Sequence, residues 1–170
     1  NIEWCKMGKD NDDIYDVIVI NDKVYNFRSG TDNFISDMIE YFPDESTAIH
    51  KYVRLVEKVS QKDLFFNIKI VRPKWLRTLI SYFISEEYHK YVNETAYDVI
   101  KSLTNNEELI AVLCGQFGNY GPTPKNASFF VHANIAHHYF EGGYYPRGGS
   151  SVIAKSIIPI IEKSGGRVLV

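Results

Sequence analysis

The spacing of hydrophobic and polar positions changes twice along the first third of the chain. In residues 14–27, IYDVIVINDKVYNF, β-branched and aromatic residues lie on both sides of the polar pair Asn21-Asp22. This pattern is typical of two short strands joined by a tight turn. The sequence therefore predicts a β-hairpin, although the glycine that usually follows asparagine in such turns is missing.

Helical spacing follows the hairpin. Apolar residues three and four positions apart predict helices over 31–42 and 44–61, the first beginning after the break at Gly30 with Thr31 as its N-cap. Further along, residues 94–103 and 107–117 read as helices separated by the polar residues 104–106. A Gly-, Pro- and Asn-rich loop is expected at 115–128, and then a helix that ends at Gly142-Gly143.

The segment 64–84, LFFNIKIVRPKWLRTLISYFI, is apolar and basic and contains no acidic residue. It is as long as a membrane span, but Pro73 and four cations argue against spanning, because a charge at the bilayer centre costs about 2.5–3.5 kcal/mol. Two interpretations stay open: core helices on either side of Pro73, or an interfacial element that contacts lipid. The residues predicted to contact the membrane are Lys69, Arg72, Lys74, Trp75 and Arg77.

Composition narrows the class of protein. The chain of 170 residues is 45% hydrophobic and 24% charged, which is ordinary for a globular domain, and its net charge of −2 gives no reason to expect nucleic acid as a partner. Cys5 and Cys114 are far apart and fit neither a zinc site nor a disulfide scaffold, so both are expected as free thiols, with Cys114 in the core. The chain begins at Asn1 without a signal segment, and we expect it to be an interior piece of a longer protein.

Three histidines, His132, His137 and His138, lie within seven residues of each other. On a helix with about 100° per residue, His132 is roughly 140° from His137 and roughly 120° from His138, so neither pair shares a face. No metal site is therefore expected. The histidines are either hydrogen-bonded beside aromatic packing, or one of them points into a substrate cavity.

The last 27 residues, YYPRGGSSVIAKSIIPIIEKSGGRVLV, predict a loop, a helix and a strand. Gly148-Gly149 precede the N-cap candidates Ser150 and Ser151, and Ile153, Ile157, Ile160 and Ile161 are expected to form a buried helical face that Pro159 weakens. Free amides at a helix start can bind an anion or an electron-rich ring edge. The two glycines are equally consistent with a turn that has no binding role. The final GGRVLV predicts a strand that needs a sheet to pair with.

These 27 residues, together with LCGQFGNYGPTP and VHANIAHHYFEGG, resemble the retinol saturases and the related carotenoid isomerases and phytoene-desaturase-like flavoproteins. The resemblance is specific over 113–170 and looser before it. It implies an FAD-dependent oxidoreductase that acts on polyene lipids such as retinoids or carotenoids, with NAD(P)H as a further electron donor left open. Reduction of a double bond is the favoured chemistry, with isomerisation or desaturation as variants.

The same resemblance assigns residues to roles. Its YPRGG block makes Tyr145, Pro146, Arg147, Gly148 and Gly149 the expected loop against the flavin. His132, His138 and Tyr139 are expected in the wall of the cavity for the lipophilic substrate. No catalytic residue is assigned.

The expected fold is α+β. Residues 1–143 are predicted to form a helix-rich substrate domain with a small antiparallel sheet, and residues 144–170 a loop-helix-strand element of an incomplete α/β FAD-binding domain. The Gly-rich phosphate-binding unit of such a domain is absent from the chain. Apolar residues at 157–161 and 168–170 are expected to complement the remainder of a longer protein. We also expect peripheral association with an endoplasmic reticulum or organellar membrane. The alternative is a non-catalytic lipid-binding or membrane-docking module.

Overall fold

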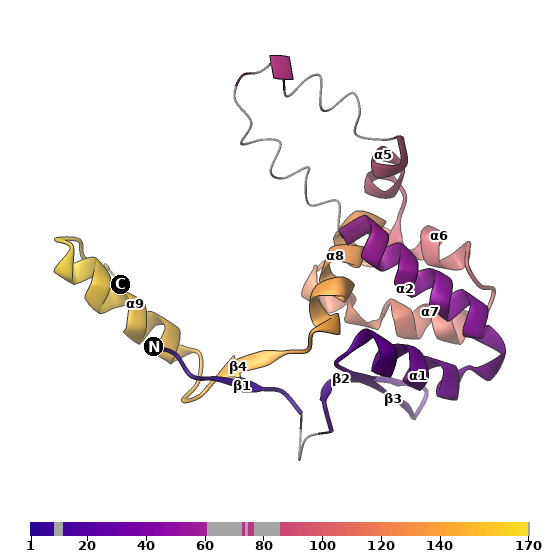
Figure 1. Cartoon of the computed structure of the whole chain (residues 1–170), viewed down its shortest axis with the longest axis horizontal. Coiled ribbons are helices and arrows are strands. Elements are labelled where there is room, and N and C mark those ends of the chain that lie inside the picture. Colours follow the sequence, from indigo (N-terminus) through magenta and orange to yellow (C-terminus); the bar gives the residue numbers. More distant parts are fainter. Residues whose placement is uncertain (9–11, 61–72, 74, 77–85, 170) are drawn as a thin grey trace.

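The computed structural model describes residues 1–8, 12–60, 73, 75–76 and 86–169 (Figure 1). A helical body carries a β-hairpin on one side, and a narrow two-stranded ribbon leads from this body to a separate helix, α9. The predicted membrane-contact residues Lys69, Arg72, Lys74 and Arg77 lie outside the described residues, whereas Trp75 is described and exposed.

The hairpin was predicted correctly. Strand β2 (Ile14–Ile20) pairs antiparallel with β3 (Lys23–Arg28), and a register shift lies between Ile14 and Asp16. Asn21 and Asp22, the two turn residues, have φ of 49° and 66°. Positive φ at both positions is the requirement of a type I′ turn, whose twist matches that of the strands.

Two helices continue from the hairpin: α1 (Thr31–Tyr41) and α2 (Ser46–Ser60), joined by the short 3₁₀ helix η1 (Pro43–Glu45). The N-cap prediction was wrong by one residue, because Gly30 is the N-cap and Thr31 is already helical. Gly30 has φ 98° and its N–H donates to the carbonyl of Phe140 at 2.7 Å. The chain therefore turns at the residue that tolerates this conformation.

The remaining helices of the body are α5 (Glu86–Asn93), α6 (Ala96–Lys101), α7 (Glu107–Leu113) and α8 (Phe129–Phe140). Thr95, Asn106 and Ser128 cap α6, α7 and α8 through their side-chain oxygens. Residues 115–119 belong to the segment predicted as loop, but they form the 3₁₀ helix η3 (Gly115–Asn119).

The core lies where α2 packs against α8 and where α1 packs against α2 and β3. Aromatic rings join these elements: Phe34 of α1 lies 5.3 Å from Phe27 of β3 and 5.2 Å from Phe140 of α8, between ring centroids. Cys114 is buried at the end of α7, as predicted. The body thus has one continuous hydrophobic core built from segments far apart in the sequence.

The C-terminal part differs from the prediction in two ways. Strand β4 (Tyr144–Pro146) pairs antiparallel with β1 (Trp4–Lys6), and helix α9 (Ser151–Lys163) then continues through Pro159 away from the body (Figure 1). The apolar face of α9 was expected to be buried, but no α9 residue is buried, and Ile157 and Ile160 are 48% and 66% exposed. No strand forms over 166–169, because no other described strand lies there to pair with it.

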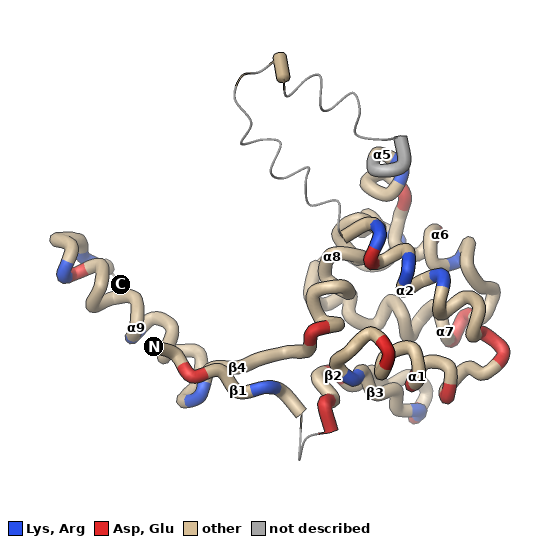
Figure 2. Tube along the Cα trace, in the orientation of Figure 1, with Lys and Arg blue, Asp and Glu red and all other residues tan. Residues whose placement is uncertain are grey.

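Charges are mixed along the described chain, with Lys and Arg interspersed among Asp and Glu (Figure 2). Within the described ranges, no helix is both long and apolar enough to cross a membrane.

Candidate functional site

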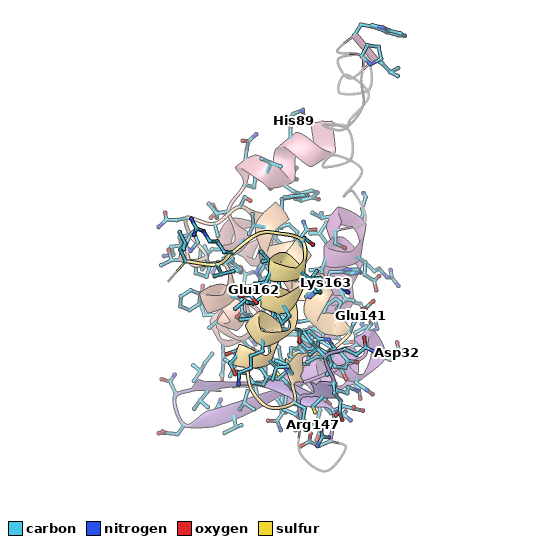
Figure 3. The ribbon with its side chains drawn as sticks, turned by 90° about the vertical axis from the view of Figure 1, so that its left-hand side faces the viewer. Asp32, His89, Glu141, Arg147, Glu162 and Lys163 are labelled. Atoms are coloured by element: carbon cyan, nitrogen blue, oxygen red, sulfur yellow. The ribbon has the colours of Figure 1, made fainter. Side chains whose placement is uncertain are left out.

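The segment Tyr145, Pro146, Arg147, Gly148 and Gly149, here called the glycine turn, connects the β1/β4 ribbon to α9. Arg147 is fixed twice to Glu3: its N–H donates to the Glu3 carbonyl at 2.9 Å, and its Nε lies 2.8 Å from Glu3 Oε1. Figure 3 shows Arg147 at the lower end of α9, with Glu162 and Lys163 on the upper part of the helix. Glu3 therefore fixes the position of the segment that leads into α9.

The two glycines are required by backbone conformation. Gly148 and Gly149 have φ of 90° and 88°, and the N–H of Gly149 donates to the carbonyl of Pro146 at 3.0 Å. A Cβ on Gly149 would meet nothing within 4 Å, whereas one on Gly148 would lie 3.1 Å from Cγ2 of Val152. The space beside Gly149 is thus open, and Ser150 makes no side-chain capping hydrogen bond to α9. The amides of Val152 and Ile153 already donate to the carbonyls of Gly149 and Ser150, so the amides of Ser150 and Ser151 are the ones left for an anion or the edge of a ring.

Exposed apolar side chains surround the glycine turn. Trp4 of β1 and Tyr144 and Tyr145 of β4 are each about half exposed, and Ile157 and Ile160 of α9 are exposed as well. Folded domains rarely leave a contiguous apolar surface uncovered unless it contacts a partner or a ligand. The ribbon and α9 therefore have the character of a surface that another element covers.

His132 lies in the core, not in an open wall. Its Nε2 is 2.8 Å from the hydroxyl of Tyr52, its Nδ1 is 3.2 Å from the hydroxyl of Tyr120, and the side chain is 2% exposed. Burial lowers the pKa of His132 to about 4, so the imidazole is neutral at neutral pH. This arrangement corresponds to the hydrogen-bonded histidine beside aromatic packing that the sequence left open.

The other predicted substrate residues have different surroundings: His138 lies roughly 120° around α8 from His132, and Tyr139 lies on nearly the same face as His132 but about two turns further along. The ring of Tyr139 stacks on that of Tyr15 with centroids 5.6 Å apart, while His138 is exposed. His138 and Tyr139 contact each other, with ring centroids 5.9 Å apart, while His132 lies about two turns earlier on α8. Their role in substrate binding stays a prediction.

His137 was not assigned a role, yet it lines a polar pocket of about 500 Å³ at the base of the ribbon. Lys6, Asp13, Thr31 and Glu141 line the same pocket. A charged lining does not suit a polyene chain. Because Thr31 and Lys6 come from distant segments, the sequence alone gave no signal for this pocket. No group of three or more metal-ligating side chains occurs in the part of the chain that the structure describes.

No protein-family profile matches the chain. It is 39% identical over 168 residues to an all-trans-retinol 13,14-reductase of Danio rerio, which covers 92% of this chain and 27% of that protein. The human all-trans-retinol 13,14-reductase is 34% identical in a match that covers 99% of this chain and 28% of the relative. A Danio rerio protein named inactive all-trans-retinol 13,14-reductase is 36% identical over 87% of this chain and 25% of its own length.

The chain thus spans about a quarter of the length of the curated relatives that it matches. Within that quarter, the similarity extends from the N-terminal ribbon strand to the glycine turn and α9, since a match to the human protein covers nearly every residue. The chain belongs to the family of the all-trans-retinol 13,14-reductases, the retinol saturases.

Proposed function

We propose that the complete protein in which this chain occurs is an FAD-dependent oxidoreductase that reduces a double bond of a retinoid. The observation that carries the proposal is the 34–39% identity, over nearly the whole chain, to proteins named all-trans-retinol 13,14-reductase. Saturating one carbon–carbon double bond adds two electrons and two protons. A bound flavin supplies a hydride in such chemistry, and the protein supplies binding, orientation and exclusion of water.

The glycine turn fits contact with a flavin. Gly149 has no side chain and opens to free space, and the amides of Ser150 and Ser151 at the start of α9 donate to no carbonyl of the described chain. Arg147, held by Glu3, adds a cation at the same end of the helix. These features together would let the backbone approach the edge of a planar, electron-rich ring.

Substrate orientation would fall to apolar residues beside this turn. Trp4, Tyr144 and Tyr145 are exposed on the ribbon that leads to Gly149, with Tyr144 and Tyr145 on opposite faces of β4. Aromatic rings offer a polyene large apolar contact area and exclude water from the reacting bond. The peripheral membrane association expected from residues 64–84 would bring the protein to its lipophilic substrate, and it is part of the proposal.

The proposal is tested by Gly149→Val in the complete protein, with Gly165→Val as the matched control. Both glycines have positive φ, 88° and 83°, flank the same helix, and would place a Cβ in open space. Both substitutions therefore carry a similar conformational cost of about 1–2 kcal/mol. We expect Gly149→Val to lose the flavin absorption bands and the reduction of all-trans-retinol, while Gly165→Val keeps both. Equal loss in the two variants would contradict a flavin contact at Gly149.

A second candidate is a non-catalytic lipid-binding module. The 36% identity to a relative named inactive favours it, because this stretch is similar to proteins of both kinds. The unsubstituted complete protein separates the candidates: a flavin spectrum with formation of dihydroretinol supports the reductase, and a colourless protein that still binds retinoid supports the module. Flavin without net reduction would instead indicate an isomerase.

A further inference from the structure

An apolar groove of about 740 Å³ lies on the body. Its lining residues come from several separate elements, and they include none from the ribbon or the glycine turn. Helix α7 forms its floor through Ile110, Ala111 and Cys114. One wall is residues 17–20 of strand β2, and the other is formed by Phe117 of η3 and by residues 123–125 of the loop that follows. In Figure 1, α7 and β2 lie in the body, well away from α9.

The groove has an apolar end and a polar end. Asp16 of β2 accepts a hydrogen bond from Gln116 in η3, just beyond the C-terminal end of α7. Lys23, after the hairpin turn, contacts Glu108 near the N-terminal end of α7. Strand β2 therefore runs along α7, from Gly115 towards Glu107. At 1.5 Å per residue the distance between Gly115 and Glu107 is about 12 Å.

The apolar end is closed by tight packing. A Cβ on Gly115 would lie 2.9 Å from three side-chain carbons of Ile18, so glycine is what allows the wall and the floor to meet there. Val17, Cys114 and Phe117 line the same end. An aliphatic chain can lie against this surface without burying a polar group.

The polar end is lined by one acid, Glu107, and one cation, Lys125. Glu107 and Glu108 each form an ion pair, with Lys101 and Lys23 respectively. Lys125 has no ion pair among the described residues, and its ammonium lies 4.8 Å from the centroid of the Tyr97 ring, which holds it at the end of the groove. An anionic group is thus the complementary partner for this end.

Strand addition to β2 is disfavoured, although its outer edge faces the groove. Ile20 and Lys23 close the two-residue turn as partners, so the amides of Val17 and Val19 point away from β3. The Val17 amide already donates to its neighbour's carboxylate, Asp16 Oδ1, at 2.9 Å, and Asp16 is itself held by Gln116. A side chain that occupies the edge in this way blocks a further strand.

We propose that this groove binds a single-chain fatty acid. Its chain lies along α7 between β2 and Phe117, and its carboxylate meets Lys125. The site is separate from the glycine turn and does not depend on the proposed reductase activity.

The test uses the complete protein and the fluorescent polyene acid cis-parinaric acid, with lauric acid and dodecanol as competitors of equal chain length. Ala111 is an exposed residue of the groove floor, so Ala111→Trp fills the groove without disturbing the core. We expect this variant to weaken binding of both competitors at least tenfold. Lys125→Met keeps the aliphatic stem and removes the charge, so it should weaken lauric acid about three- to tenfold and leave dodecanol unchanged.

The matched control is Lys51→Met, which removes one exposed charge from α2 and should leave both affinities unchanged. Equal binding of acid and alcohol by the unsubstituted protein, or wild-type affinity in Ala111→Trp, would overturn the proposal. Binding to phosphatidylserine vesicles without binding of monomeric acid would also overturn it, as would a dimer that Ala111→Trp dissociates. A protein that lacks flavin but binds lauric acid through Lys125 would support this site while contradicting the reductase.

Discussion

His132 connects three separate segments of the body through one buried imidazole. Its two nitrogens meet hydroxyls from α2 and from the loop after η3, and its ring lies 5.7 Å from that of Phe129 on the same helix. A neutral imidazole has one donor and one acceptor, so it can satisfy one partner of each kind here. Protonation would leave a buried charge and remove the acceptor.

We therefore expect stability to fall as the pH drops below about 6.5. The pKa of His132 in the folded protein is about 4, below its ordinary value of 6.5, so the unfolded chain binds this proton first. The contribution of the neutral imidazole is complete above pH 6.5 and is lost between pH 6.5 and about 4. At pH 5 the loss is about 2 kcal/mol.

Urea unfolding at pH 7 and at pH 5 measures this loss as a change in the free energy of unfolding. His132→Gln cannot titrate and should show a smaller decrease than the unsubstituted protein, whatever its stability at pH 7. The exposed His138→Gln serves as control and should keep the full decrease. An equal decrease in all three proteins would contradict the role of His132.

The sequence predicted part of this arrangement. Helical geometry showed that the three histidines of α8 do not share a face, which is correct. Which of them is buried depends on Tyr52, 80 positions away, and on Tyr120. A helical pattern contains no information about such distant partners, so the trio assigned to a substrate wall was chosen from resemblance and not from packing.

Among the elements, the hairpin was the easiest to predict, because its pattern is local. Two apolar runs around a polar pair determine both the strands and the position of the turn. The structure shows that Asp22 takes the conformation that glycine usually supplies, with φ 66°. A residue with a Cβ is strained in this region.

Replacing Asp22 by glycine should therefore stabilise the protein by up to about 1 kcal/mol, even after the entropy that glycine adds to the unfolded chain. Thermal or urea unfolding at pH 7 measures this gain. Lys23→Gly is the control: it lies in β3, with no positive φ, and should destabilise. A loss of stability with Asp22→Gly would show that the aspartate side chain contributes more than its backbone costs.

Helix α9 shows the limit of prediction by periodicity. The spacing of its isoleucines predicted a helix and an apolar face, and both are present. Periodicity cannot tell whether a face is covered, since that depends on the neighbours that the fold supplies. For α9, the described chain supplies none that bury it.

At the scale of the whole molecule, a compact body and an extended arm differ in how they bury apolar surface. The body has a continuous core, while the ribbon and α9 expose Trp4, Tyr144, Tyr145 and the isoleucine face. The sequence predicted that apolar residues at 157–161 would complement the remainder of a longer protein, but no pattern indicated that residues 4–6 would pair with 144–146. Three-residue strands are too short for a pattern.

We expect the 170-residue chain to self-associate through α9. Ile157→Glu combined with Ile160→Glu places charges on the exposed apolar face and should shift the chain towards monomer, without loss of stability because neither residue is buried. Sedimentation velocity over a range of concentrations measures the change. Ser151→Glu, on the same helix, is the control for added charge and should associate as the unsubstituted chain does. A monomeric unsubstituted chain at high concentration would contradict the prediction.

The pairing of β1 with β4 also sets a waiting time during synthesis. Trp4 and its partner Pro146 are 142 positions apart. At about 5–20 residues per second, the ribosome needs roughly 7–28 s to make the second strand after the first has been made. During that interval Trp4 and its neighbours have no strand to pair with. Glu3 likewise has no partner until Arg147 of the glycine turn has been synthesised. The arm that carries the proposed flavin contact can therefore form only after all the residues between its two strands have been synthesised.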